Sequence, residues 1–119
     1  MFSERIAENF TNPTHGGEIQ DPQIVLENKD PVCGDQIRIT LAVDAGVISA
    51  ARFRAWGCAT SLATANILCK WMEGKSLAVC AAATGDTLAE QLGTLTPEQK
   101  HCHVIAVNLV AQLDQEAPA

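Results

Sequence analysis

Residues 36–56 of this chain, QIRITLAVDAGVISAARFRAW, decide the fold. Apolar residues at every odd position from Ile37 to Val43 alternate with mostly polar ones, and this period of two predicts a half-buried strand. Asp44-Ala45-Gly46 predicts a tight turn, so residues 47–56 are expected to return as the second strand of a hairpin. Before the hairpin, a short apolar run predicts a further strand at residues 23–27.

Helical patterns flank and follow these strands. We expect a helix over residues 59–72 with one apolar side made of Leu62, Ala65, Leu68 and Met72, and two short helices at 77–83 and 88–92. Near the start, Phe2, Ile6 and Phe10 predict a short helix with a single apolar stripe. Strands followed by helices indicate an α+β fold, in which helices cover one face of a small antiparallel sheet.

The last helix has a recognisable start signal. Thr96 is the expected N-cap, Pro97 occupies the first helical position, and Gln99 completes a capping box. The apolar stripe of this helix runs from Cys102 to Leu113.

Composition restricts the classes of function. The 119 residues are enough for one domain, taken as residues 1–119, with 14 acidic against 8 basic side chains and a net charge of −6. This charge argues against nucleic-acid binding, and no apolar run is long enough to span a membrane. The start shows no signal peptide, so five cysteines predict reduced thiols in the cytoplasm.

Three cysteines stand at boundaries between the predicted elements. Cys33 precedes the first hairpin strand, Cys58 begins the long helix, and Cys102 lies in the first turns of the last helix. A helix N-terminus favours the thiolate, which is the form that binds soft metals or attacks sulfur. Asp35 adds a carboxylate two residues after Cys33. From type and position alone, a ligand and a buried apolar side chain are about equally good readings of these cysteines.

Other candidate residues have simpler interpretations. Cys69 and Cys80 lie among apolar helical residues and are expected to be buried packing groups. His101 and His103 flank the apolar stripe at similar angles, so helix geometry cannot choose between them. An unpartnered surface histidine is the simplest interpretation of each histidine, above all of His15. Trp56 and Trp71 are expected to be packing residues. Glu90, Glu98 and residues 114–116 are expected to carry charges exposed to solvent.

Several short motifs occur in a characteristic order. They are Val32–Asp35, Ala51–Phe53 leading into Trp56–Cys58, and Lys100–Cys102, supported by Asn9–Pro13 and Gly74–Leu77. With these motifs the chain resembles the iron–sulfur cluster assembly scaffolds, IscU and the N-terminal domain of NifU, from about residue 3 to residue 113.

The resemblance implies a three-stranded antiparallel sheet with helices packed over it, and a scaffold rather than a turnover enzyme. Cys33, Cys58 and Cys102 would be thiolate ligands of a transient 2Fe–2S cluster, with Asp35 and His101 as additional ligands. A carboxylate or imidazole in the fourth place would favour release of the cluster over storage. Cys102 would also accept persulfide sulfur, and zinc can occupy the same site when no cluster is present.

The resemblance also implies partners. A cysteine desulfurase of the IscS or NifS type would supply sulfur, iron would be delivered, and recipient apo-proteins would take the cluster; a homodimer is left open. Residues 95–100 lack the double proline through which the IscU branch engages its dedicated chaperone, which argues against that partner. Ala59-Thr60-Ser61 also replaces the usual small Gly-Ser step after Cys58.

Two alternatives remain open from the sequence. One is a zinc-dependent persulfide sulfurtransferase resembling SufU, although the short interval from Cys58 to Cys102 and the presence of His101 favour the scaffold. The other is a purely structural zinc domain, which would unfold on chelation. The continuous apolar stripes predict that the fold instead survives metal removal.

Overall fold

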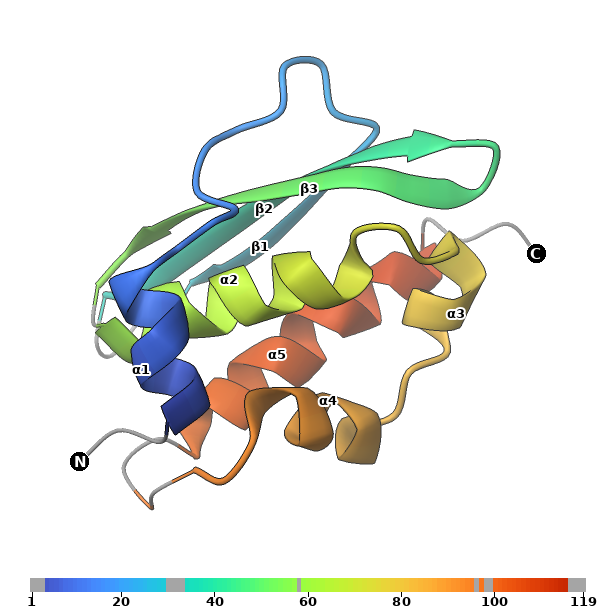
Figure 1. The fold of residues 1–119 in the computed structure, drawn as a ribbon. Coiled ribbons are helices and arrows are strands. Elements are labelled where there is room, and N and C mark those ends of the chain that lie inside the picture. The colour runs from blue at the N-terminus through green and yellow to red at the C-terminus, as the bar shows by residue number, and fades with distance from the viewer. Residues whose placement is uncertain (1–3, 30–33, 58, 96, 98–99, 116–119) are drawn as a thin grey trace.

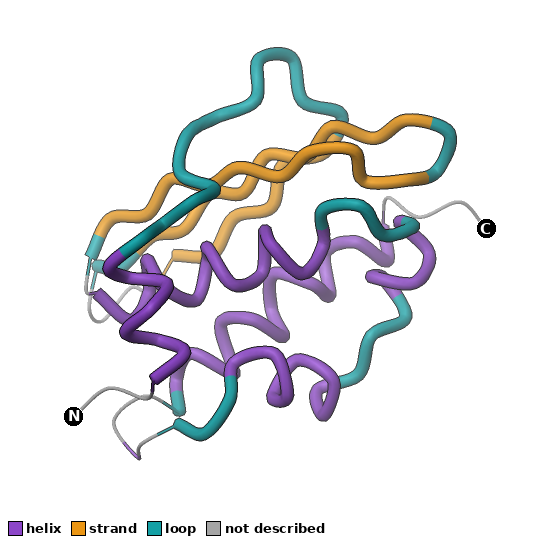
Figure 2. Tube along the Cα trace, viewed as in Figure 1, coloured by secondary structure: helices purple, strands orange, loops and turns teal. Residues whose placement is uncertain are grey.

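In the computed structural model a three-stranded antiparallel sheet is covered on one face by helices (Figures 1 and 2). The structure describes residues 4–29, 34–57, 59–95, 97 and 100–115. The strands, in sheet order, are β1 (Ile24–Lys29), β2 (Gln36–Asp44) and β3 (Val47–Trp56). The helices are α1 (Glu4–Thr11), α2 (Ala59–Met72), α3 (Leu77–Ala81), α4 (Gly85–Leu92) and α5 (His101–Ala111), and a 3-10 turn (Gln112–Gln115) follows. The α+β prediction is confirmed.

The β2–β3 hairpin forms as its sequence pattern predicts. Ala45 and Gly46 take positive φ values of 52° and 80°, which suits a tight two-residue turn between right-twisted strands. The register places Ile39 opposite Leu26 of β1 on one side and Phe53 of β3 on the other. All three side chains are buried, so the period of two fixes which face of the sheet meets the helices.

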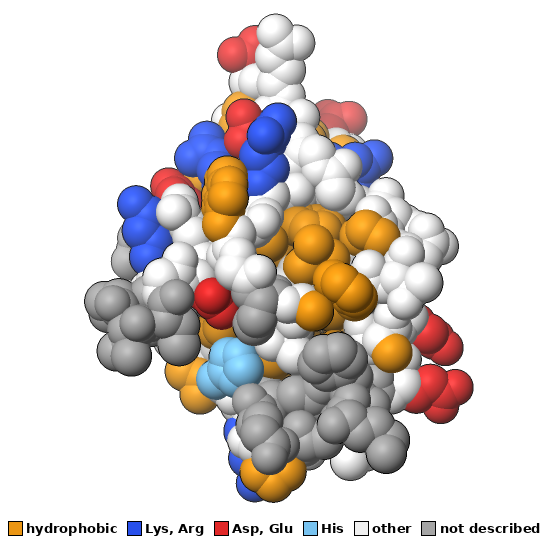
Figure 3. Space-filling model, turned by 90° about the vertical axis from the view of Figure 1, so that its left-hand side faces the viewer, with side chains coloured by type: hydrophobic (Ala, Val, Ile, Leu, Met, Phe, Trp, Pro, Cys, Tyr) orange, Lys and Arg blue, Asp and Glu red, His pale blue; other side chains and the backbone are white. Residues whose placement is uncertain are grey.

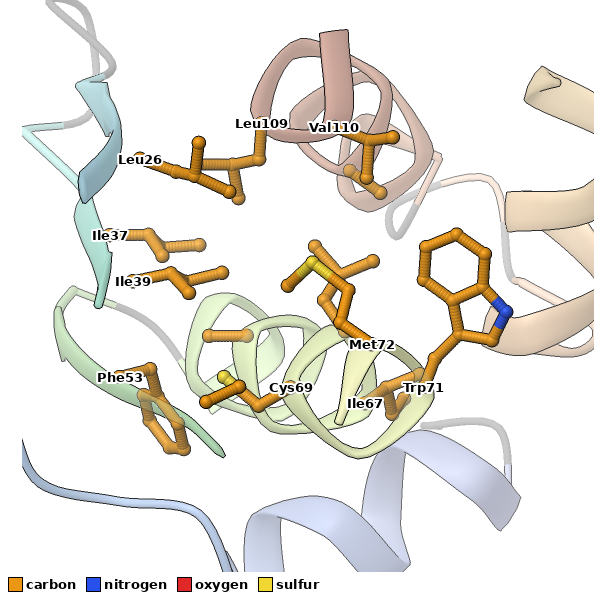
Figure 4. Packing of buried hydrophobic residues seen from close by; sticks show 14 of the residues in the cluster. Leu26, Ile37, Ile39, Phe53, Ile67, Cys69, Trp71, Met72, Leu109 and Val110 are labelled. Atoms are coloured by element: carbon orange, nitrogen blue, oxygen red, sulfur yellow. The ribbon is translucent and has the colours of Figure 1, made fainter. Parts of the chain in front are cut away.

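The long helix α2 lies against the sheet, with α5 packed beside it (Figure 4). The bounds of α2 agree with the prediction, but the prediction that only one side of this helix is buried is wrong. Eleven of its residues are buried, and they include Thr64 and Asn66, while Leu62 is only partly buried. Because the sheet, α1 and α5 surround α2, nearly its whole circumference is covered. The stripe of the last helix is confirmed, since its predicted members are all buried: Cys102, Ile105, Ala106, Leu109, Val110 and Leu113.

The N-terminal helix packs differently from its predicted stripe. Ile6 is buried, but Phe10 is 44% exposed, and Phe2 lies outside the described residues. The buried neighbour on α1 is Asn9, whose amide group donates to the Arg5 carbonyl and accepts a hydrogen bond of 2.7 Å from Asn66 of α2. A polar pair therefore takes the place expected for an aromatic ring.

The loop after α1 is pinned to the sheet and to α2. Phe53 N donates to the His15 carbonyl oxygen, and the His15 amide donates to Asn66. The His15 ring lies 3.1 Å from Glu73, whose other oxygen accepts from Arg52 at 2.8 Å. The prediction of an unpartnered surface histidine is therefore wrong for His15, because these partners come from segments far along the chain.

Two helix starts differ from the prediction. Helix α4 begins at Gly85 rather than at Leu88, because the Thr84 hydroxyl accepts a hydrogen bond from the amide of Thr87 and caps the helix. Helix α5 begins at His101, four residues after Pro97, and the side chain of Lys100 at its N-cap position makes no capping hydrogen bond. Thr96 and Gln99, the expected capping box, lie outside the described residues. Among the described helices, none is long and apolar enough to cross a membrane.

Candidate functional site

Two of the predicted site residues, Asp35 and Cys102, lie at the end of the molecule where α2 begins. Strand register explains part of this arrangement, because Gln36 at the start of β2 pairs with Trp56 at the end of β3. The residues just outside this pair, Asp35 and Gly57, are therefore neighbours, and α2 starts two residues after Gly57. Cys33 and Cys58 lie outside the described residues.

The carboxylate of Asp35 is held at the first turn of α2. Ser61, the third residue of the helix, is fully buried and donates a hydrogen bond of 3.0 Å from Oγ to Asp35 Oδ2. Gly57 lies so close on another side that a Cβ atom there would stand 2.5 Å from Asp35 Cγ and closer still to Oδ1. No acidic residue occupies the first turn of α2 itself, so Asp35 supplies negative charge beside the positive end of the helix dipole.

Cys102 reaches the same turn of α2 from another element. It is the second residue of α5, its side chain is fully buried, and its Sγ lies 3.9 Å from the carbonyl oxygen of Thr60. Since Thr60 and Ser61 are consecutive, the structure brings Asp35 and Cys102 to one turn although 67 positions separate them in the sequence. This agrees with the prediction that Cys102 lies at a helix start.

The structure separates the two histidines that helix geometry left equivalent. His103 Nε2 lies 2.8 Å from the carbonyl oxygen of Gly85, so one ring nitrogen donates within the fold and is not available as a ligand. This partner corrects the simplest interpretation of His103. His101 is exposed at the first position of α5, directly before Cys102.

The remaining described cysteines are packing residues, as predicted. Cys69 and Cys80 are fully buried, and burial raises the pKa of each thiol above its ordinary value, most strongly for Cys69. A raised pKa keeps the thiol protonated, which disfavours metal binding and nucleophilic attack.

The tryptophans have different surroundings. Trp71 is 8% exposed and packs in the core, as expected, whereas Trp56 is 49% exposed and the packing prediction is wrong for it. Trp56, with Phe53, Pro13 and Leu62, lines a shallow surface cavity of about 260 Å³. Figure 3 looks onto this end of the molecule and shows apolar side chains gathered on its surface.

The donor chemistry suits a transition metal. A thiol, a carboxylate and an imidazole are ligands of iron and zinc, and three of the predicted donors, Asp35, His101 and Cys102, belong to described segments. Within those segments alone, no three His, Cys, Asp or Glu side chains form a group able to hold a metal ion. Sequence reasoning did not identify Ser61 and Gly57 as the residues that fix the carboxylate, because no short motif marks contacts across 26 and 22 positions.

Comparison with known proteins identifies relatives over most of the chain. Residues 1–113 match the family described as NifU-like N terminal domain. The chain is 32% identical over 108 residues to the iron–sulfur cluster assembly scaffold protein IscU 1 of Archaeoglobus fulgidus, covering 91% of this chain and 71% of that relative. It is 30% identical over 116 residues to the scaffold protein IscU of Escherichia coli strain K12, covering 92% and 88%.

Solved structures share the fold. The N-terminal region of a nitrogen-fixing NifU-like protein from Brucella abortus superposes with a TM-score of 0.72 at 16% identity, covering 96% of this chain and 92% of that one. A putative scaffold protein for the SUF system from Fervidobacterium islandicum superposes with a TM-score of 0.67 at 20% identity, covering 95% and 93%.

Proposed function

Because the chain belongs to the NifU-like N-terminal domain family, which includes the IscU scaffolds, we propose a specific way in which it carries its cargo. The protein is an iron–sulfur cluster assembly scaffold and not a turnover enzyme. The cargo proposed here is a 2Fe–2S cluster, built at the end of the molecule where α2 begins and then passed on.

The proposed ligands are the thiolates of Cys33, Cys58 and Cys102, with Asp35 and His101 as additional ligands that exchange in the fourth place. The observation that carries this assignment is the approach of Asp35 and Cys102 to consecutive residues of α2, Ser61 and Thr60. The same turn follows Gly57, the chain neighbour of Cys58, and Gly57 packs against Asp35. Three thiolates with one oxygen or nitrogen donor hold a cluster less firmly than four thiolates, which suits a protein that must release it.

Sulfur is proposed to enter through Cys102. Its thiolate attacks the outer sulfur of a persulfide on a cysteine desulfurase, the sulfur–sulfur bond of that persulfide breaks, and the desulfurase cysteine leaves as a thiolate. Cys102 then carries the persulfide. Because the Cys102 side chain is fully buried in the described fold, this attack requires the start of α5 to move away from α2.

The proposed partners follow from this chemistry. A cysteine desulfurase of the IscS or NifS type supplies sulfur, and recipient apo-proteins accept the finished cluster. The cluster is held by one chain or bridged between two copies. Zinc is the proposed occupant of the thiolates in the cluster-free protein, since thiolate, imidazole and carboxylate ligands all bind it.

Anaerobic reconstitution with ferrous iron and sulfide tests the proposal. A scaffold develops the visible absorption of a cluster, with iron and acid-labile sulfide in equal amounts, and Cys102→Ser or Cys58→Ala loses it. Cys80→Ser is a matched control, because Cys80 is a buried thiol away from the site and the variant is expected to keep the absorption. A colourless zinc protein that accepts persulfide would instead identify a SufU-like sulfurtransferase.

A second experiment addresses a purely structural metal. The described core contains 26 buried hydrophobic residues drawn from the sheet and the helices, so folding is expected to persist without metal. Thermal unfolding with and without a chelator should therefore show one cooperative transition in both samples. Loss of the transition on chelation would indicate a structural zinc domain.

A further inference from the structure

Ser61 is a buried hydroxyl group whose hydrogen bond points at a proposed ligand. Its Oγ donates to Asp35 Oδ2 at 3.0 Å, and its side chain is fully buried in the first turn of α2. A hydrogen bond to a carboxylate is stronger than one between neutral groups, and burial shields it from water. One of the two carboxylate oxygens is therefore fixed by a residue that belongs to no ligand motif.

Gly57 restricts the same carboxylate from a second direction. A Cβ atom at position 57 would stand 2.5 Å from Asp35 Cγ, so only a glycine leaves room for the group where it lies. Gly57 also has a φ of +131°, a backbone conformation that other residues rarely adopt. Asp35 is thus confined between the backbone at Gly57 and the hydroxyl of Ser61.

We propose that Ser61 is the positioning residue of this site, which orients the Asp35 carboxylate for binding iron or zinc. The inference rests on the proposed function, in which Asp35 is a ligand. Residues that hydrogen-bond to metal-binding carboxylates fix their orientation, and their loss typically weakens metal binding by about 10–100-fold. Without the Ser61 hydroxyl, the carboxylate would have to be ordered at the moment when metal binds.

A purely structural role makes a different prediction. The Asp35–Ser61 pair also places negative charge at the N-terminus of α2, which stabilises the helix. If that were its whole purpose, Ser61→Ala would lower the unfolding temperature but leave metal affinity unchanged. Metal affinity at a temperature where every variant is folded therefore distinguishes the two roles.

The experiment is a zinc titration of the metal-free protein against a coloured competing chelator. Four proteins form a double-mutant cycle: the unchanged chain, Ser61→Ala, Asp35→Ala, and the double variant. Thr40→Val is the matched control, because Thr40 is a buried residue of β2 whose hydroxyl bonds to the backbone of Ile19 and Arg52 rather than to Asp35. Thermal unfolding of each variant is measured in parallel.

We expect the zinc dissociation constant to rise about tenfold in Ser61→Ala and less than twofold in Thr40→Val. In the Asp35→Ala background, Ser61→Ala should add less than a twofold change, because the group that Ser61 orients is gone. A change below twofold in the single variant, an equal change in both backgrounds, or no zinc binding by the unchanged protein would overturn the inference. Reconstitution of the unchanged protein separates the two claims, since a normal cluster with no effect of Ser61→Ala refutes the positioning role alone.

Discussion

Replacing Gly57 by alanine should be one of the most damaging single-methyl changes at the site. A backbone with φ of +131° costs an alanine about 1–2 kcal/mol. The new Cβ would also stand 2.5 Å from Asp35 Cγ, and overpacking of this kind costs about 1–3 kcal/mol. Moving Asp35 away breaks its bond to Ser61, which adds about 1 kcal/mol. The expected loss of unfolding free energy is therefore about 3–6 kcal/mol.

Gly17→Ala is the matched control for the backbone contribution. Gly17 has a φ of +135°, close to that of Gly57, and a Cβ atom added there would meet nothing within 4 Å. This variant should lose only about 1–2 kcal/mol, equivalent to about 4–8 °C in unfolding temperature for a domain of this size. Gly57→Ala should lose about 12–24 °C on the same scale.

The contact with Asp35 can be isolated by urea unfolding of the metal-free protein. In an Asp35→Ala background, Gly57→Ala should cost only about 1–2 kcal/mol more, because the carboxylate that it displaces is absent. If Gly57→Ala were no more destabilising than Gly17→Ala, Asp35 would not be confined by Gly57 and the described geometry of the site would be wrong.

Three other predictions concern the surrounding structure. Burial raises the pKa of Glu73, but hydrogen bonds from the Ala51 amide, Arg52 and His15 together outweigh burial and lower this pKa below its ordinary value of 4.5. The ionised Glu73 carboxylate therefore contributes its full stability above pH 4.5. This contribution is lost as the pH falls through the lower pKa that Glu73 has in the folded protein. Glu73→Gln should therefore lose about 1–2 kcal/mol at pH 7 and show a flatter decline in urea-unfolding stability toward pH 3; a parallel decline in both proteins would contradict this. Asn66→Ala should lower the free energy of unfolding by about 2–4 kcal/mol, because it leaves Asn9 Oδ1 and the His15 amide without their partner. Amide hydrogen exchange in α1 should become faster. Unchanged exchange in α1 would show that Asn66 does not hold this helix in place. Cys102 should be alkylated at least about 100-fold more slowly in the folded metal-free protein than in urea, because the fold must open around this buried thiol before it can react. Mass spectrometry of the peptide that contains Cys102 measures both rates. Equal rates would show that the thiol is not buried.

The sequence predicted the parts of the fold whose signals are local. The hairpin follows from alternation between Ile37 and Val43 and from a turn whose residues tolerate positive φ. The bounds of α2 and the buried stripe of α5 likewise follow from helical periodicity. In each of these segments the pattern extends over so many residues that no single side-chain contact decides the secondary structure.

Errors arose where one distant partner decided the outcome. Phe10 is exposed because the inward face of α1 is set by the Asn9–Asn66 bond, which joins residues 57 positions apart. His15 has a carboxylate partner at Glu73 for the same kind of reason. Periodicity detects a face but does not reveal what will lie opposite it.

The site shows the same division between local and distant information. Motifs marked Asp35, His101 and Cys102, and the structure brings Asp35 and Cys102 to one turn of α2. Ser61 and Gly57 were missed because their importance depends on the position of a carboxylate supplied from across the hairpin. Sequence patterns thus identified candidate donors, whereas the groups that orient one of them became visible only in three dimensions.

The hairpin register explains why motifs so far apart in the chain can serve one site. Pairing of Gln36 with Trp56 sets Asp35 beside Gly57, and the chain then turns directly into α2. Helix α5 starts at the same end of the molecule, so two helix N-termini lie near the proposed ligands (Figure 1). Positive helix ends favour thiolate and carboxylate over their protonated forms, and they can do so before metal arrives. A slip of one residue in the β2–β3 pairing would turn the buried face of one of the two strands outward and separate Asp35 from Gly57. Selection for a packed sheet and selection for the site therefore act on the same register.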